Sequence, residues 1–185
     1  MTSRRGGGVR MSSFTKGLKK VEVALKWDPS PAGSPPHDLD IVAATYTSAD
    51  PGSEPAYVVH FDSRSPDGTI NLDRDSTTGQ GFGFDEVMTL ELERLSTSYA
   101  RVVVGVAIQQ GEQATTFGAV ANTAVRVREG YTDLALNDFS VVADSTAAVV
   151  AEFIRDDSGA WAFRELLQGF DTDPTSFAAT MGSAH

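Results

Sequence analysis

Residues 20–27 have the sequence Lys-Val-Glu-Val-Ala-Leu-Lys-Trp, in which a large apolar side chain occupies every second position. The apolar face would hold Val21, Val23, Leu25 and Trp27. Successive side chains of an extended chain point to opposite faces of a sheet, so this alternation predicts a β-strand with one buried face. The same pattern of apolar residues can be used to predict strands elsewhere in the chain.

Further strand candidates are separated by turn residues along the whole chain. They lie at residues 39–46, 57–61, 69–72, 88–93, 101–108, 124–128, 139–143, 148–154 and 160–163. Many short strands with regular turn signals are typical of an all-β, two-sheet β-sandwich. A short C-terminal helix is expected as well, because Asp173 can cap its start and Pro174 suits its first turn.

Length and composition predict one globular domain without disulfides. The 185 residues contain no cysteine, which excludes thiolate nucleophiles and fits a reducing compartment, so we expect a cytoplasmic protein. No stretch approaches the roughly 20 apolar residues of a membrane span, and no integral membrane association is expected. We assign residues 1–13 to a flexible basic N-terminal extension and residues 14–185 to the β-sandwich domain.

The charge of the chain is unevenly distributed. Its formal net charge is −10, and residues 38–86 hold ten acidic and only two basic residues. Residues 1–20, by contrast, hold six basic residues and no acidic one. Binding to a phosphate backbone depends on lysine and arginine, so an acidic body argues against nucleic acid as a partner.

Acidic residues gather in three clusters at the ends of predicted strands. The clusters contain Asp38 and Asp40, then Asp62 and Asp67, then Asp73, Asp75, Asp85 and Glu86. Calcium takes six to eight oxygen ligands, which several loops at one end of a sandwich can supply together. Acidic loop residues are also commonly just solvated, so each cluster alone has that simpler interpretation.

The sequence contains no clear catalytic motif. His37 and His60 could serve a metal-dependent hydrolase together with the carboxylates, but they have no short ligand spacing. The glycine-rich stretch at 79–83 lacks a lysine that would bind phosphate. We therefore expect a protein that is not an enzyme.

An ordered series of motifs resembles the TerD family of tellurium-resistance and stress-response proteins. The series is Phe14-Thr-Lys-Gly17, Trp27-Asp28, Asp38-Leu-Asp40, Ser65-Pro-Asp-Gly68, Arg74-Asp75, Gly79-Gln-Gly81, Asp85-Glu86, Phe117, Arg126-Val-Arg128 and Trp161-Ala-Phe163. It covers nearly the whole chain. The resemblance implies a calcium-binding β-sandwich that is associated with tellurite resistance and with protein partners in a stress response.

The resemblance also implies a set of calcium ligands. Matching positions are Asp38, Asp40, Asp67, Asp75, Asp85 and Glu86, and Asp62 is added as a possible replacement for lost ligands. Phe82 and Phe84 stand where the family often has aspartate, so we expect at least one calcium ion where the family pattern suggests two. An alternative is that Phe82 and Phe84 form an apolar finger that contacts a protein or a membrane, with weakened metal loops.

Overall fold

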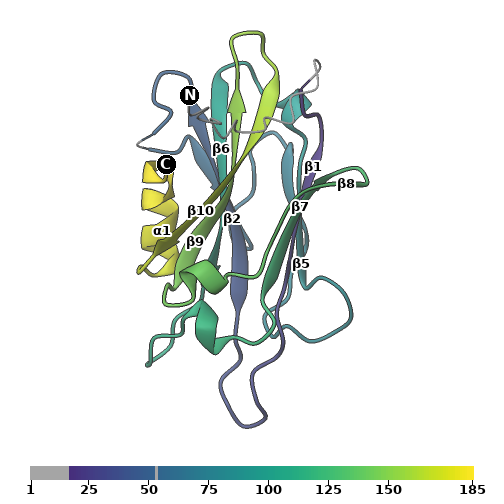
Figure 1. Ribbon diagram of the computed structural model, residues 1–185. Coiled ribbons are helices and arrows are strands. Elements are labelled where there is room, and N and C mark those ends of the chain that lie inside the picture. Colours follow the sequence, from purple (N-terminus) through teal and green to yellow (C-terminus); the bar gives the residue numbers. More distant parts are fainter. Residues whose placement is uncertain (1–16, 53) are drawn as a thin grey trace, which may run out of the picture.

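Two five-stranded antiparallel sheets pack face to face in the computed structural model, which describes residues 17–52 and 54–185 (Figure 1). This arrangement confirms the predicted all-β sandwich. The predicted extension, residues 1–13, lies outside the described residues. No helix among the described residues is long and apolar enough to cross a membrane.

The first sheet has the strand order β4-β5-β1-β7-β8. Its strands are β4 (Ile70–Arg74), β5 (Glu86–Leu90), β1 (Val21–Lys26), β7 (Ala124–Glu129) and β8 (Thr132–Asn137). The alternating residues of β1 behave as predicted, because Val21, Val23 and Leu25 are all fully buried. They face the second sheet and form the centre of the core.

The second sheet has the strand order β10-β9-β6-β2-β3. Its strands are β10 (Trp161–Phe170), β9 (Ala147–Arg155), β6 (Tyr99–Ile108), β2 (Leu39–Thr47) and β3 (Tyr57–Val59). Strand β6 is buried on both faces, as its valine-rich sequence predicts. Val102, Val104 and Val106 face the first sheet, whereas Val103 faces outward.

The outer face of the second sheet is covered by the C-terminal helix α1 (Pro174–Thr180), drawn in yellow in Figure 1. Asp173 caps this helix by accepting a hydrogen bond from the Ser176 N–H at 2.7 Å, as predicted. Phe177 packs against the sheet where β6 has Gly105, and a Cβ atom at that position would overlap the phenyl ring. The one glycine in the valine-rich strand therefore makes room for the helix.

One strand prediction was wrong, and another was shifted. Residues 139–143 contain a 3-10 helix, Ser140–Val142, instead of a strand. The strand predicted at 88–93 is β5, but it runs from Glu86 to Leu90, and Leu92–Arg94 forms a 3-10 helix. The missed strand is β8, whose sequence Thr-Asp-Leu-Ala-Leu-Asn has its three apolar residues side by side and not in alternation. It is an edge strand with little buried surface, so it shows no strong alternation.

Candidate metal centre

Three carboxylates converge at the end of the sandwich where β2 and β5 begin and β4 ends. Asp40 is the second residue of β2, Asp75 follows the last residue of β4, and Glu86 is the first residue of β5. Strand β2 belongs to one sheet, and β4 and β5 belong to the other. The site therefore spans the two layers.

One carboxylate oxygen from each of Asp40, Asp75 and Glu86 lies within 4.8 Å of the other two. Two oxygens on opposite sides of one calcium ion are about 4.8 Å apart, since each lies about 2.4 Å from the ion. This triplet is the only such group among residues 17–52 and 54–185. We refer to it as the carboxylate triplet.

Glu86 is the most deeply buried member of the triplet. Its side chain reaches across to the other sheet, where Oε2 accepts a hydrogen bond from the Ile41 N–H at 2.8 Å. Its other oxygen, Oε1, is buried without a hydrogen-bond partner. Burial and the neighbouring Asp75 and Asp40 raise the pKa of Glu86 to about 11.

Asp38 and Asp40 interact electrostatically with Asp75 in the same charge cluster. Burial, together with the charges of Asp40 and Asp75, raises the pKa of Asp38 to about 7. Burial also raises the pKa of Asp40, although a hydrogen bond from Gln109 Nε2 to Oδ2 at 2.6 Å opposes that shift. The Oδ1 atom of Asp38 is buried without a hydrogen-bond partner.

These observations fit a hard cation. The two unpaired buried oxygens, of Asp38 and Glu86, belong to groups whose raised pKa values reflect burial and mutual repulsion. A divalent ion would offset that repulsion and supply the missing partner. The oxygen-only donor set matches calcium or magnesium better than a transition metal.

Asp85, a fifth predicted ligand, has a different environment. Its Oδ2 atom accepts a hydrogen bond from the Trp27 N–H at 2.9 Å, and its own N–H donates to the Leu25 carbonyl at 2.8 Å. Burial raises the pKa of Asp85, and the hydrogen bond from Trp27 acts in the opposite direction. Asp85 thus fixes the loop beside β1.

The structure does not bring Asp62 and Asp67 into the carboxylate triplet. Asp67 Oδ1 accepts hydrogen bonds from the Thr69 N–H at 3.1 Å and from Thr69 Oγ1 at 2.7 Å, which closes the predicted turn. Asp62 is exposed, and its N–H donates to His60 Nδ1 at 3.2 Å. The ligand roles of both residues stay predictions.

Gln109, which follows the last residue of β6, was missed by sequence reasoning. It is 69 positions from Asp40 in the chain, and a lone glutamine carries no motif. His37 and His60, named for the hydrolase alternative, are not members of the triplet. The charge of His60 does lower the pKa of Asp40, so the imidazole lies near the site.

Phe82 and Phe84 do not form one finger. Phe82 is 99% exposed, whereas the Phe84 ring lies under the Arg126 guanidinium, 4.3 Å from its centroid to Arg126 Cζ. Lys26 Nζ lies 6.0 Å from the same ring. Of the two phenylalanines, only Phe82 points freely into solvent.

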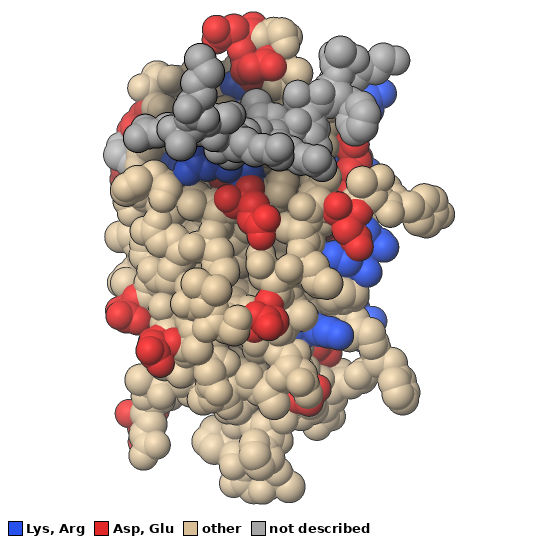
Figure 2. Space-filling model, viewed as in Figure 1, with Lys and Arg blue, Asp and Glu red and all other residues tan. Residues whose placement is uncertain are grey.

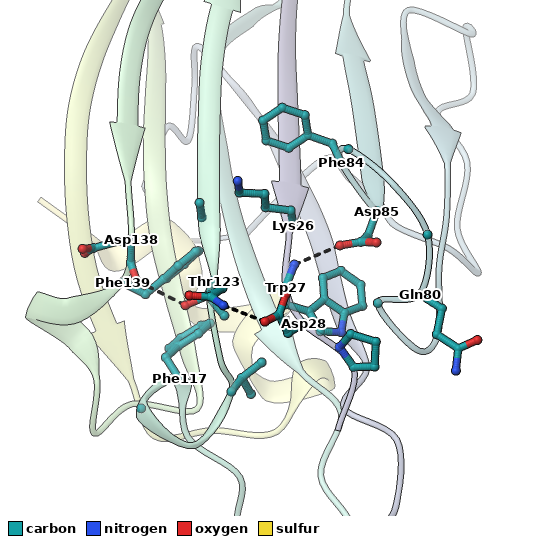
Figure 3. A pocket seen from close by; sticks show the side chains of 18 of the residues that line it. Lys26, Trp27, Asp28, Gln80, Phe84, Asp85, Phe117, Thr123, Asp138 and Phe139 are labelled. Atoms are coloured by element: carbon teal, nitrogen blue, oxygen red, sulfur yellow. Dashed lines mark hydrogen bonds between the residues drawn. The ribbon is translucent and has the colours of Figure 1, made fainter. Parts of the chain in front are cut away.

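Phe82 lines a groove of about 1030 Å³, which Figure 3 shows from close by with Lys26, Trp27 and Phe84 among the labelled lining residues. One wall is the loop Gly79–Asp85, the second is the end of β1 with Lys26 and Asp28, and the third includes Phe117 and Phe139. The Asn122 Nδ2 amide donates to Asp28 Oδ2 at 2.6 Å across it. We call this hollow the Phe82 groove.

The acidic character of the protein is spread over the surface. Figure 2 shows red acidic side chains scattered over the visible face, with fewer basic ones. The carboxylate triplet differs from these surface acids in the convergence of its three oxygens and in the burial of Asp40 and Glu86.

Fold and site together define a class: β-sandwich proteins with a carboxylate cluster suited to one cation at one end of the two sheets. The family model described as "TerD domain" matches residues 1–180. The chain therefore belongs to the TerD family.

Relatives support this membership along the whole chain. Tellurium resistance protein TerD of Serratia marcescens is 26% identical over 184 residues, covering 96% of this chain and 95% of that protein. General stress protein 16U of Bacillus subtilis (strain 168) is 24% identical over 185 residues, covering 96% and 95%.

A solved structure is much more similar. The crystal structure of a homologue of telluride resistance protein (TerD) from Streptomyces coelicolor A3(2) is 61% identical, with a TM-score of 0.90, and the match covers 91% of this chain and 100% of that one. The TerD family, to which the chain belongs, is linked to tellurium resistance.

Proposed function

We propose that this chain is a calcium-binding, non-enzymatic stress-response protein that contributes to tellurium resistance. The observation that carries the proposal is the carboxylate triplet, in which oxygens of Asp40, Asp75 and Glu86 lie within 4.8 Å of one another. Asp38 would be a fourth ligand, and backbone carbonyls of the Gly79–Asp85 loop could complete the shell.

Calcium is preferred over magnesium for a geometric reason. Asp75 is exposed and follows a strand end, whereas Asp40 and Glu86 are buried and fixed by hydrogen bonds to Gln109 and Ile41. Magnesium demands near-ideal octahedral geometry at about 2.0–2.1 Å, and a site with fixed members from two sheets meets that less easily. Calcium accepts longer and less regular coordination.

Calorimetric titration of calcium into chelator-stripped protein tests the proposal. We expect saturable binding with a stoichiometry of about one, lost in an Asp75→Asn, Glu86→Gln double variant. An Asp157→Asn variant is the matched control, because Asp157 is an exposed carboxylate that is neither in the triplet nor among the predicted ligands, and its loss should leave binding intact. No heat with the wild type, and no shift of its melting temperature, would contradict the proposal.

The non-enzymatic part of the proposal is tested separately. We expect no turnover of a panel of phosphate and ester substrates by the calcium-loaded protein above a metal-free control. Turnover that disappears in a His60→Ala variant would favour a metal-dependent hydrolase instead, because His60 lies near Asp40. The proposal further includes a cytoplasmic location and stress-response proteins, rather than nucleic acid, as partners.

A second candidate function is protein interaction through the Phe82 loop. The observation that favours it is the nearly complete exposure of Phe82 beside the Phe82 groove. A fully exposed phenylalanine next to an apolar hollow is typical of a contact surface. This candidate does not compete with calcium binding, because Phe82 is not a member of the carboxylate triplet.

A further inference from the structure

Gln109 contacts both acidic residues of the Asp38-Leu-Asp40 segment. Its backbone N–H donates to the Asp38 carbonyl at 2.8 Å, which extends the pairing of β6 with β2 by one residue. Its side-chain Nε2 atom donates to Asp40 Oδ2 at 2.6 Å. A residue outside the carboxylate triplet therefore connects two candidate ligands to the end of β6.

The contact between Gln109 and Asp40 follows from the register of the two strands. Asp40 on β2 lies opposite Ala107 on β6, and Gln109 comes two residues after Ala107. Residues two apart on a strand share a face, and a diagonal neighbour in an antiparallel pair lies within reach of a long side chain. Strand pairing thus brings the Gln109 amide to the Asp40 carboxylate.

The hydrogen bond suits a carboxylate that binds a cation. Asp40 is buried, and a hydrogen bond to an ionised carboxylate is roughly twice as strong as one between neutral groups. Asp75 and Glu86, as carboxylates, can only accept hydrogen bonds, so neither can hold the Asp40 oxygen in this way. An ionised carboxylate has about four lone-pair sites, so Asp40 can bind an ion while Gln109 donates to Oδ2.

The neighbouring residue Gln110 makes hydrogen bonds of another kind. Its Nε2 atom donates to the carbonyls of Ile108 and Thr115, both at 3.0 Å, and its Oε1 atom accepts from the Thr115 N–H at 2.8 Å. These bonds close the loop after β6 and involve no candidate ligand. The two adjacent glutamines therefore differ in what they hold: Gln110 holds its own loop, and Gln109 holds the carboxylate.

We propose that Gln109 is a positioning residue for the cation, which holds the Asp40 carboxylate in the orientation that converges with Asp75 and Glu86. The inference rests on the calcium site proposed above, and it adds an uncharged residue that does not itself bind the ion. Hydrogen-bonding groups behind metal ligands contribute about ten- to hundredfold to metal affinity. Because the amide carries no charge, its removal weakens binding without changing the charge of the site.

Calcium titration of chelator-stripped Gln109→Met and Gln110→Met variants tests the proposal, because methionine resembles glutamine in length and flexibility but lacks the amide. We expect the dissociation constant of Gln109→Met to rise about ten- to hundredfold, while its melting transition shows that it is folded. Gln110→Met should keep the wild-type dissociation constant, although it loses the bonds that close its loop. An unchanged constant in Gln109→Met, or an equal rise in both variants, would overturn the proposal.

A double-mutant cycle separates positioning from direct contact with the ion. Because Gln109 acts through Asp40, Gln109→Met should have no further effect on the dissociation constant in an Asp40→Ala background. In an Asp75→Asn background it should keep its effect. A full additional loss in the Asp40→Ala background would mean that Gln109 binds the ion itself, and the positioning role would be wrong.

The same titrations distinguish the role of Gln109 from the calcium site on which it depends. No binding by the wild-type protein would overturn the calcium site and the role of Gln109 together. Saturable binding that is equally tight in the wild type and in Gln109→Met would overturn only the role of Gln109.

Discussion

Glu86 combines burial, a hydrogen bond to the opposite sheet and an oxygen without a partner. Its Oε2 atom accepts from the Ile41 N–H, while Oε1 is buried and unpaired. A buried carboxylate near two other acids keeps its charge only at high cost, which is why its pKa is raised to about 11. Without a cation this residue carries a proton at neutral pH.

Replacing Glu86 by glutamine should separate binding from folding. The amide oxygen can still accept from Ile41, and the uncharged group suits burial, so the metal-free variant should be as stable as the metal-free wild type. Calcium should no longer raise its melting temperature. Thermal denaturation with and without calcium checks both statements, and a large loss of stability in the metal-free variant would contradict this account of Glu86.

The stability of the metal-free protein should fall as pH rises. The folded-state pKa values of Asp38 and Glu86, about 7 and about 11, exceed their ordinary values of 3.8 and 4.5. The folded state therefore binds more protons than the unfolded state above about pH 4, and the stabilisation present below that pH is lost as pH rises through the folded pKa values.

Melting temperatures of chelator-treated protein between about pH 5 and about pH 8 measure this effect. At this chain length each 1 kcal/mol lost lowers the melting temperature by about 2–4 °C. Saturating calcium should reduce or reverse the fall, because calcium binds the deprotonated carboxylates. A metal-free melting temperature that rises over this range would show that the carboxylates are not coupled as described.

At the scale of elements, the C-terminal segment is held on the second sheet by one buried arginine. Arg101 on β6 pairs with Glu152 on β9, its Nη2 atom lying 2.6 Å from Oε2. Its other donors reach the carbonyls of Gly182 at 2.6 Å and Ala184 at 3.0 Å. Arg101 thus links two strands to the residues that follow α1.

An Arg101→Ala variant should lose about 3–5 kcal/mol of unfolding free energy, because it leaves Glu152 buried without its main partner. Arg94→Ala is the control, since the Arg94 to Glu91 pair at 2.6 Å lies on the surface and should contribute at most about 1 kcal/mol. Urea denaturation of both variants measures the difference. Equal losses would mean that burial does not set the strength of the Arg101 pair.

Elements with an apolar face could be predicted from the sequence, and those without one could not. Strand β1 alternates because its large apolar residues, Val21, Val23 and Leu25, all face one core. Strand β8 shows no alternation because an edge strand buries little. Residues 139–143 are mostly apolar because Phe139 and Val142 fill the core at the start and end of a short 3-10 helix. A short apolar run does not by itself distinguish these structures.

The candidate site was predictable in part for a related reason. Asp40, Asp75 and Glu86 stand at strand ends, and the sandwich brings strand ends together. The hydrogen bond that Asp67 accepts from Thr69 depends on local rotamers. The hydrogen bond that Asp40 accepts from Gln109 depends on the pairing of strands that are distant in the sequence. Neither is visible in residue type or spacing.

For the whole molecule, the carboxylate triplet is a junction between the two layers. Asp40 belongs to the second sheet, and Glu86 belongs to the first, so an ion bound by both would connect the two sheets. The acidic net charge of −10 adds a general repulsion that a divalent cation reduces.

Calcium at about a hundred times its dissociation constant should therefore stabilise the folded protein by about 2.7 kcal/mol. At this size that corresponds to a rise in melting temperature of roughly 5–10 °C. A calcium titration followed by differential scanning calorimetry measures it, with magnesium at the same concentrations as the control. An equal rise with magnesium would argue against a calcium-selective site.

Trp27 lies against Gly79 and can report optically on the loop that contains this glycine. The loop at Gly79 presses so closely on the Trp27 indole that a Cβ atom would collide with it, and the indole N–H donates to the His37 carbonyl at 2.8 Å. The same loop runs from Asp75 to Glu86, whereas Trp161 lies under Arg155. A rearrangement of this loop would thus alter the emission of Trp27 more than that of Trp161, so the intrinsic fluorescence of the protein reports on the loop.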